Sequence, residues 1–247
     1  FFCSNVSGLS LFYSRRIGRS PQLSGINGDA SSPTATRILG AGKVTGRLPG
    51  GFSLGFLDAV TDRVGGPGGT TLEPTSNYGV LRGNQDYHNG DGSVGFIVTG
   101  VNRSLDASST PFLHRSAYRG GLDARRRFGG RFEVSGSFDF SRVDGSAAAI
   151  ALTQRDPVHL YQRPDGPLVY DSTRTSLTGT NMELRFAKVG GRRLQFETAY
   201  QRRTPGFEVN DIGFLRQADR QAWTTWAALA FRTPNHVFQS LRWNFNN

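Results

Sequence analysis

The feature that most constrains the fold is a repeated alternation of apolar and polar residues. Between Arg131 and Arg142, every second residue is apolar or glycine, and the positions between are acidic or carry hydroxyls. The first set is Phe132, Val134, Gly136, Phe138 and Phe140, and the second is Glu133, Ser135, Ser137 and Asp139. A period of two places the two sets on opposite faces of a β-strand. The same reasoning predicts about eleven strands, near residues 8–13, 35–47, 51–61, 78–84, 92–102, 117–127, 131–142, 181–186, 192–200, 219–232 and 241–245.

The connections between these segments fall into two length classes that alternate along the chain. The short ones are 48–50, 85–91, 128–130, 189–191 and 233–236, and the long ones are 14–34, 62–77, 103–116, 143–175 and 204–218. Several short ones contain glycine pairs, which allow the positive φ angles of tight hairpins. In an up-and-down meander, alternate connections lie at opposite ends of the sheet. Short turns at one end and long loops at the other are typical of bacterial outer-membrane barrels.

We therefore expect an all-β fold, an antiparallel up-and-down transmembrane β-barrel formed as one domain over residues 1–247. Polar strand residues would line its interior, and apolar ones would face outer-membrane lipid. The interior set comprises Glu133, Asp139, Glu183, Arg185, Arg193 and Glu197. Aromatic residues would lie at the membrane interfaces, namely Tyr118, Tyr200, Trp223 and Trp243. The alternative is a soluble periplasmic β-sandwich, in which the apolar face packs on a protein core.

Composition narrows the function classes. The net charge of +10 comes almost entirely from arginines scattered along the chain, because only Lys43 and Lys188 are lysines. A nucleic-acid interface would concentrate this charge on one element, so no nucleic-acid partner is expected. The single Cys3 excludes an internal disulfide and a multi-cysteine metal site. The four histidines lack metal-ligand spacing, so we expect neither a metal nor a cofactor.

Three segments resemble one bacterial family. They are residues 11–19 (LFYSRRIGR), 38–46 (ILGAGKVTG) and 205–215 (PGFEVNDIGFL), and the resemblance spans about residues 8–232. Members of that family join an N-terminal carbohydrate-binding-like domain to a C-terminal outer-membrane-type β-barrel of unassigned function. The resemblance implies that this chain is the barrel part, incomplete at one or both ends, in a protein of the bacterial outer membrane. It also implies a role in carbohydrate binding or uptake. An odd strand number agrees with an incomplete barrel, because bacterial single-chain barrels have even numbers.

Charged and amide residues of three long connections fall at the same predicted end of the barrel. These candidate binding residues are Arg15, Arg16, Arg19, Arg163, Asp165, Glu208, Asn210 and Asp211. Loops on one face of a rigid barrel can converge into a site for a polar ligand such as a glycan. The competing interpretation is that these residues pair with one another and only order the loops.

Catalysis has little support in the sequence. Residues 51–55 (GFSLG) match the G-x-S-x-G pattern of hydrolase nucleophiles. That motif requires a sharp strand-to-helix turn at the serine, whereas Ser53 lies inside a predicted strand. We assign no catalytic residue and expect a passive, non-enzymatic domain. The alternative is an envelope hydrolase that acts on glycan or lipid at the barrel rim.

Overall fold

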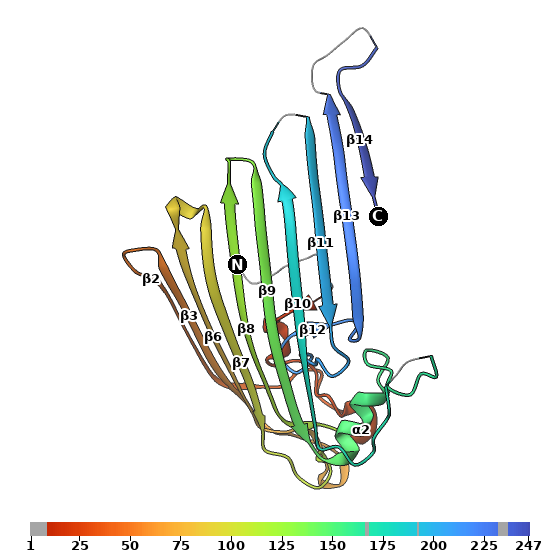
Figure 1. Cartoon of the computed structure of the whole chain (residues 1–247). Coiled ribbons are helices and arrows are strands. Elements are labelled where there is room, and N and C mark those ends of the chain that lie inside the picture. The colour runs from red at the N-terminus through yellow and green to blue at the C-terminus, as the bar shows by residue number, and fades with distance from the viewer. Residues whose placement is uncertain (1–8, 166–167, 192, 232–236) are drawn as a thin grey trace.

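A large antiparallel sheet dominates the fold (Figure 1). The computed structural model describes residues 9–165, 168–191, 193–231 and 237–247. In this sheet, strands that follow one another in the chain lie side by side, in the order β14-β13-β11-β10-β9-β8-β7-β6-β3-β2. Its strands are β2 (Ile38–Arg47), β3 (Phe52–Thr61), β6 (Ser76–Tyr87), β7 (Gly92–Arg103), β8 (His114–Phe128), β9 (Phe132–Gly145), β10 (Ser176–Lys188), β11 (Leu194–Arg203), β13 (Arg220–Phe231) and β14 (Leu241–Asn246).

The all-β antiparallel prediction is confirmed, but the closed barrel is not observed. Among the described residues, β2 pairs with β3 alone and β14 with β13 alone, so the sheet has two open edges. The predicted strand near 8–13 is also absent from this sheet. Its short counterpart, β1 (Leu9–Ser10), pairs instead with β12 (Phe214–Leu215). The sequence showed an alternating apolar pattern at this strand but could not show which partner the strand would choose.

The predicted sorting of connections by length is confirmed where the structure describes them. Figure 1 shows tight turns at one end of the sheet and long connections at the other. Glycines at turn positions adopt left-handed backbone angles, with φ of 88° at Gly51 and 61° at Gly130. The predicted turn at 233–236 lies outside the described residues. We call the two ends the short-turn end and the long-connection end.

The long connections contain the remaining elements. The connection after β3 carries the hairpin β4 (Val64–Gly65) and β5 (Thr71–Glu73). The connection after β9 carries the helix α2 (Ala147–Arg155), whose N-cap Ser146 accepts a hydrogen bond from the Ala149 backbone. A four-residue helix, α1 (Ser24–Asn27), lies in the N-terminal segment. Among the described residues, no helix is long and apolar enough to cross a membrane.

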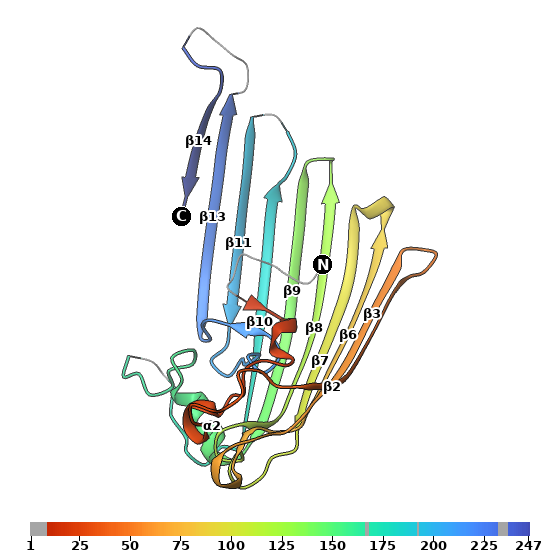
Figure 2. The same ribbon diagram turned by 180° about the vertical axis from the view of Figure 1, so that it is seen from behind.

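The two faces of the sheet differ in chemistry. One face, which we call the inner face, is covered near the long-connection end by the N-terminal segment 9–37 and by the connection 204–219, the inner loop (Figures 1 and 2). On β9, Asp139 points to the inner face and is 1% exposed, whereas its neighbours Phe138 and Phe140 are exposed by 52% and 46% on the outer face. On this part of β9 the acidic side chain is therefore buried and its apolar neighbours are exposed.

Ion pairs link neighbouring strands across the inner face. Arg119 of β8 donates to Asp139 at 2.8 Å, and Asn181 of β10 donates to the same carboxylate at 3.0 Å. Nearer the short-turn end, Arg185 bridges Glu133 at 2.7 Å and Glu197 at 2.6 Å. Of the residues predicted to line the interior, all but one lie on this face: Glu133, Asp139, Glu183, Arg185 and Glu197. Arg193 is exposed and precedes β11. Burying a charged side chain costs a large free energy unless it is paired and hydrogen-bonded, as these side chains are.

An apolar core fills the inner side at the long-connection end. Its buried members come from five strands and from the connections, and they are Tyr78, Val80, Ile97, Val101, Ala117, Val143, Ile150, Tyr161, Leu177 and Ile212. A smaller cluster of Leu9, Phe207, Val209, Leu215 and Ala218 joins the N-terminal segment to the inner loop. The inner loop is therefore fixed by packing from both sides, which positions the site described next.

Candidate functional site

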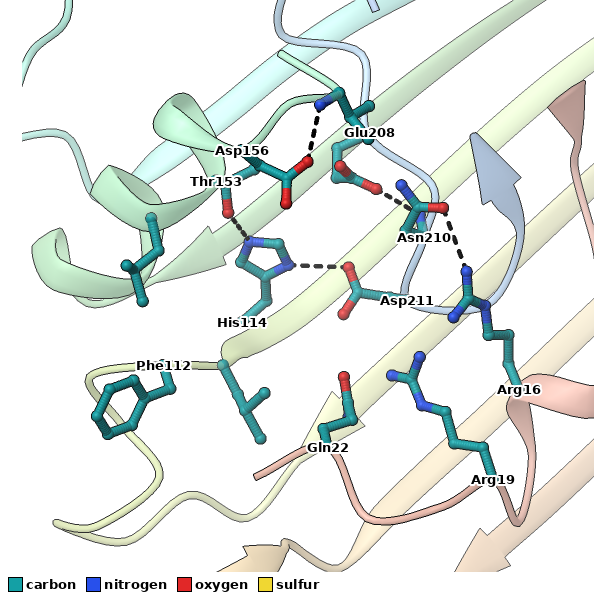
Figure 3. Close-up of a pocket in the computed structure, with 13 residues that line it drawn as sticks. Arg16, Arg19, Gln22, Phe112, His114, Thr153, Asp156, Glu208, Asn210 and Asp211 are labelled. Atoms are coloured by element: carbon teal, nitrogen blue, oxygen red, sulfur yellow. Dashed lines mark hydrogen bonds and ion pairs between the residues drawn. The ribbon is translucent and has the colours of Figure 1, made fainter. Parts of the chain in front are cut away.

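A pocket of about 350 Å³ opens at the long-connection end (Figure 3). Four segments that are distant in the sequence line it: the N-terminal segment, the β7–β8 connection, α2 with the residues after it, and the inner loop. The lining residues are Arg16, Arg19, Gln22, Phe112, Leu113, His114, Leu152, Thr153, Asp156, Val158, Glu208, Asn210 and Asp211.

The inner loop reaches this position because glycines let it lie directly against β10. A Cβ added to Gly179 would stand 2.2 Å from the backbone nitrogen of Phe207, so only glycine permits this contact. Phe207 is fully buried, and the backbone N–H of Glu208 donates to Ser141 on β9 at 3.0 Å. The loop thus lies directly on the inner face, where Glu208, Asn210 and Asp211 line the pocket and Val209 packs in the smaller apolar cluster.

Asp211 anchors the floor of the pocket. Arg103, whose side chain is fully buried, donates to Asp211 at 2.6 Å, and the Nδ1 atom of His114 lies 2.9 Å from the other carboxylate oxygen. Burial alone would raise the pKa of Asp211, but the positive charges of His114 and Arg103 outweigh it and hold that pKa well below its usual range. Asp211 is therefore a permanent anion whose charge is already neutralised.

A second buried pair holds the loop at Glu208. The Nε2 atom of His159 lies 2.6 Å from Glu208, and its Nδ1 atom lies 2.7 Å from the carbonyl oxygen of Pro205. Both neighbours are acceptors, so the ring must carry a proton on each nitrogen when Glu208 is ionised. Burial opposes that charge, yet the hydrogen bond and the negative charge of Glu208 raise the pKa of His159 above its usual value.

The two arginines of the N-terminal segment differ in their contacts. Arg16 donates to the carbonyl oxygen of Gly213 at 2.9 Å and to Asn210 at 3.3 Å. The side chain of Arg19 has no hydrogen-bond or ion-pair partner within the part of the chain that the structure describes, and its Nε atom is buried. Burial and the neighbouring charge of Arg103 lower the pKa of Arg19 below its usual value, but a guanidinium stays protonated in water.

The structure brings together five of the eight predicted binding residues. Arg16, Arg19, Glu208, Asn210 and Asp211 all line the pocket. The other three lie elsewhere. Arg15 is exposed and does not line the pocket. Arg163 contacts Asp219 at 2.7 Å and the exposed Asp165 at 3.5 Å, in a separate ion pair. Arg163, Glu208 and Asp211 thus have ionic partners, as the competing interpretation expects, but the partners of Glu208 and Asp211 are residues outside the predicted set.

Several pocket residues escaped the sequence analysis. His114 and Asp156 line the pocket, and His159 fixes the loop behind it, whereas the sequence analysis considered the histidines only as metal ligands. His114 and Asp211 are 97 positions apart, and no spacing rule connects them. Only the meander topology could have indicated that they lie close together, because it brings one end of β7, β8, β9 and β11 to the long-connection end of the sheet.

Ser53 does not have the environment of a hydrolase nucleophile. It lies near the start of β3, paired with Arg47 on β2 and Asn84 on β6, after a turn that joins two strands and not at a strand-to-helix turn. In the described ranges, no group of three or more histidine, cysteine, aspartate or glutamate residues is placed to hold a metal ion. The pocket presents charged and hydrogen-bonding side chains to a ligand.

Comparison with known families adds one assignment. Residues 7–247 match the family described as a domain of unknown function, DUF5916. The chain belongs to this family. No curated protein and no solved structure matches it. The DUF5916 match covers the whole sheet, the inner loop and the pocket, so these features belong to a single family domain.

Proposed function

We propose that this DUF5916 domain is the membrane-embedded β-barrel domain of a bacterial outer-membrane protein, in which the outer face of the sheet contacts lipid. The observation that carries the proposal is the exposure of large apolar side chains along the outer face. Those on the central strands are Val94, Val98, Leu122, Val134, Phe138, Phe140 and Leu184, each between 45% and 63% exposed. Contiguous apolar surface of this extent needs an apolar partner, and lipid supplies one without a second protein layer.

The dimensions of the apolar band support a bilayer. On the outer face of β9, apolar residues and one glycine run from Phe132 to Phe140, and the charged pair Arg142 and Asp144 follows. Eight residue steps at about 3.4 Å span about 27 Å along the strand. At a strand tilt of about 40°, this becomes about 21 Å along the membrane normal, close to the band of about 25 Å in outer-membrane barrels.

The flanks of this band have interfacial character. Tyr118 lies opposite Arg142 in the strand register, and its hydroxyl donates to Asn102. Amphipathic aromatic rings with a satisfied polar atom are typical of the boundary between lipid and water.

A closed cylinder is required for this environment, because unpaired backbone groups are costly in lipid. The proposal therefore includes further pairing at β2 and β14, whose residues are exposed along both edges. The soluble β-sandwich remains the second candidate, and it requires a protein layer over the outer face. The described residues place connections on the inner face and supply no such layer.

Within the envelope, we propose a passive role in binding or uptake of a polar solute such as a carbohydrate. The pocket supports the binding part, since it combines apolar walls with charged and amide groups. The carbohydrate part is supported by the family resemblance described above.

The membrane proposal is tested by the gel mobility of the full-length protein recovered from membranes in mild detergent, with and without boiling. A detergent-resistant barrel migrates faster before boiling, and it stays in the membrane pellet after carbonate washing. Equal mobility in both lanes, together with release by carbonate, would exclude the barrel and support the sandwich.

A further inference from the structure

The unpartnered guanidinium of Arg19 is the unusual group in the pocket. Figure 3 shows its side chain pointing into the cavity, with no interaction marked to it. Its Nε atom is buried without a hydrogen-bond acceptor, although a buried donor left unpaired is costly. Nearby, Arg16 already donates to Asn210 and to the loop backbone. In the described structure, Arg19 is thus the pocket cation still available to a ligand.

The acidic side chains around Arg19 do not serve as its partner. Asp211 is held by Arg103 and His114, and Glu208 is held by His159. Asp156 accepts a hydrogen bond from the Val158 backbone at 2.8 Å. Because Asp211 and Glu208 are neutralised by their own cationic partners, they do not compensate the charge of Arg19. The balance of charge fits a ligand with one negative charge.

The rest of the lining indicates what else the ligand carries. Gln22 donates its amide nitrogen to Glu73 at 2.8 Å, so its amide oxygen remains an acceptor, as does the second carboxylate oxygen of Asp156. Acceptors of this kind require donors on the ligand, such as hydroxyl groups. Phe112 and Leu152 form apolar parts of the pocket wall. A volume of about 350 Å³ fits a molecule of monosaccharide size.

We propose that this pocket binds a small hydroxylated monocarboxylic acid, of which a sugar acid is the simplest case, and that Arg19 receives its carboxylate. A guanidinium offers parallel N–H groups that match the two oxygens of a carboxylate. The inference rests on the proposed function, because that function places the long-connection end at the cell surface, where solutes arrive.

The test is isothermal titration calorimetry of the detergent-solubilised full-length protein with glucuronate, glucose and glucose 6-phosphate. Glucuronate is expected to bind at least about tenfold more tightly than glucose, which lacks the carboxylate, and than glucose 6-phosphate, which carries a dianion. The Arg19→Gln variant should lose at least about tenfold in glucuronate affinity, and Arg19→Lys should fall between it and the parent. Arg15→Gln is the matched control, because Arg15 is exposed outside the pocket.

Three results would overturn the proposal: no heat of binding with glucuronate, equal affinity for glucose, or unchanged affinity in Arg19→Gln. Preference for glucose 6-phosphate would replace the carboxylate with a phosphate and would also overturn it. The gel mobility shift of each variant reports the barrel separately from the pocket. A normal shift with no binding refutes the pocket alone, whereas binding without a shift refutes the membrane proposal and leaves the pocket standing.

Discussion

Two positions on the outer face of β8 give a quantitative test of the lipid environment. Leu122 lies opposite Phe138 near the middle of the apolar band, and Tyr118 lies opposite Arg142 at its edge. The two are four residues apart on one strand, which is about 14 Å along the strand and about 10 Å in depth at a tilt of about 40°. Their exposed fractions, 63% and 47%, are similar.

We expect arginine to be tolerated at the edge of the band and not at its centre. In a bilayer, Leu122→Arg should lower the free energy of unfolding by about 2–4 kcal/mol, whereas an arginine near the interface costs about 0–1 kcal/mol. Tyr118→Arg also removes the exposed hydrogen bond from the Tyr118 hydroxyl to Asn102, which adds about 1 kcal/mol to the cost of that variant. If water covered this face, substitution of the more exposed Leu122 would fall within about 0.5 kcal/mol of the parent.

The assay is guanidinium titration of the full-length protein in phosphatidylcholine vesicles, followed by the fluorescence of its tryptophans. Leu122→Ala is the control for loss of the side chain, since it removes apolar contact without adding charge. The lipid-facing assignment would be refuted if the free energies of unfolding of Leu122→Arg and Leu122→Ala differed by less than about 0.5 kcal/mol, because an arginine at the middle of a bilayer destabilises a barrel by more than that.

Three further predictions concern the inner loop. Gly179→Ala should displace the loop and destabilise the fold by about 1–3 kcal/mol, measured by proteolysis within 204–219, whereas Gly120→Ala, with open space around its Cβ, should leave cleavage unchanged. Asp211→Asn leaves a buried arginine uncompensated and should cost about 3–5 kcal/mol in the same denaturant titration; a cost below 1 kcal/mol would contradict the pairing. Because the pKa of His159 is raised on folding, its pair with Glu208 contributes fully below about pH 6.5 and is lost as pH rises through the folded value. Loop proteolysis should therefore increase with pH above that range in the parent and not in His159→Gln.

The sheet could be predicted closely because its determinants are local. Alternation and glycine turns lie within each hairpin, and the observed β9, Phe132–Gly145, differs little from the predicted 131–142. The pairing of β1 is not local: its two residues pair with β12 across 206 and 204 positions, and the alternation near residues 8–13 carried no information about that partner. Closure of the sheet likewise depends on what meets β2 and β14.

The site was predictable only in part, for the same physical reason. The rule that alternate connections share one end placed Arg16 and Asp211 together correctly. It could not distinguish Arg19, which faces the cavity, from Arg15, which faces solvent, since that depends on the path of an irregular segment. It also placed Arg163 in the same set, although this residue pairs with Asp219 away from the pocket.

The pairing of β1 with β12 has a consequence for the order of assembly. Each main strand can join the sheet as soon as its predecessor is in place, so the sheet can grow in the order of synthesis. The segment that holds β1 and Arg16 precedes the sheet in the sequence, yet its partners, β12 and the Gly213 carbonyl that accepts from Arg16, lie about two hundred residues later. That segment must wait, without its final contacts, until most of the sheet exists. We therefore expect β1 and Arg16 to dock late, and the pocket, which Arg16 and Arg19 help to line, to be completed at the same step.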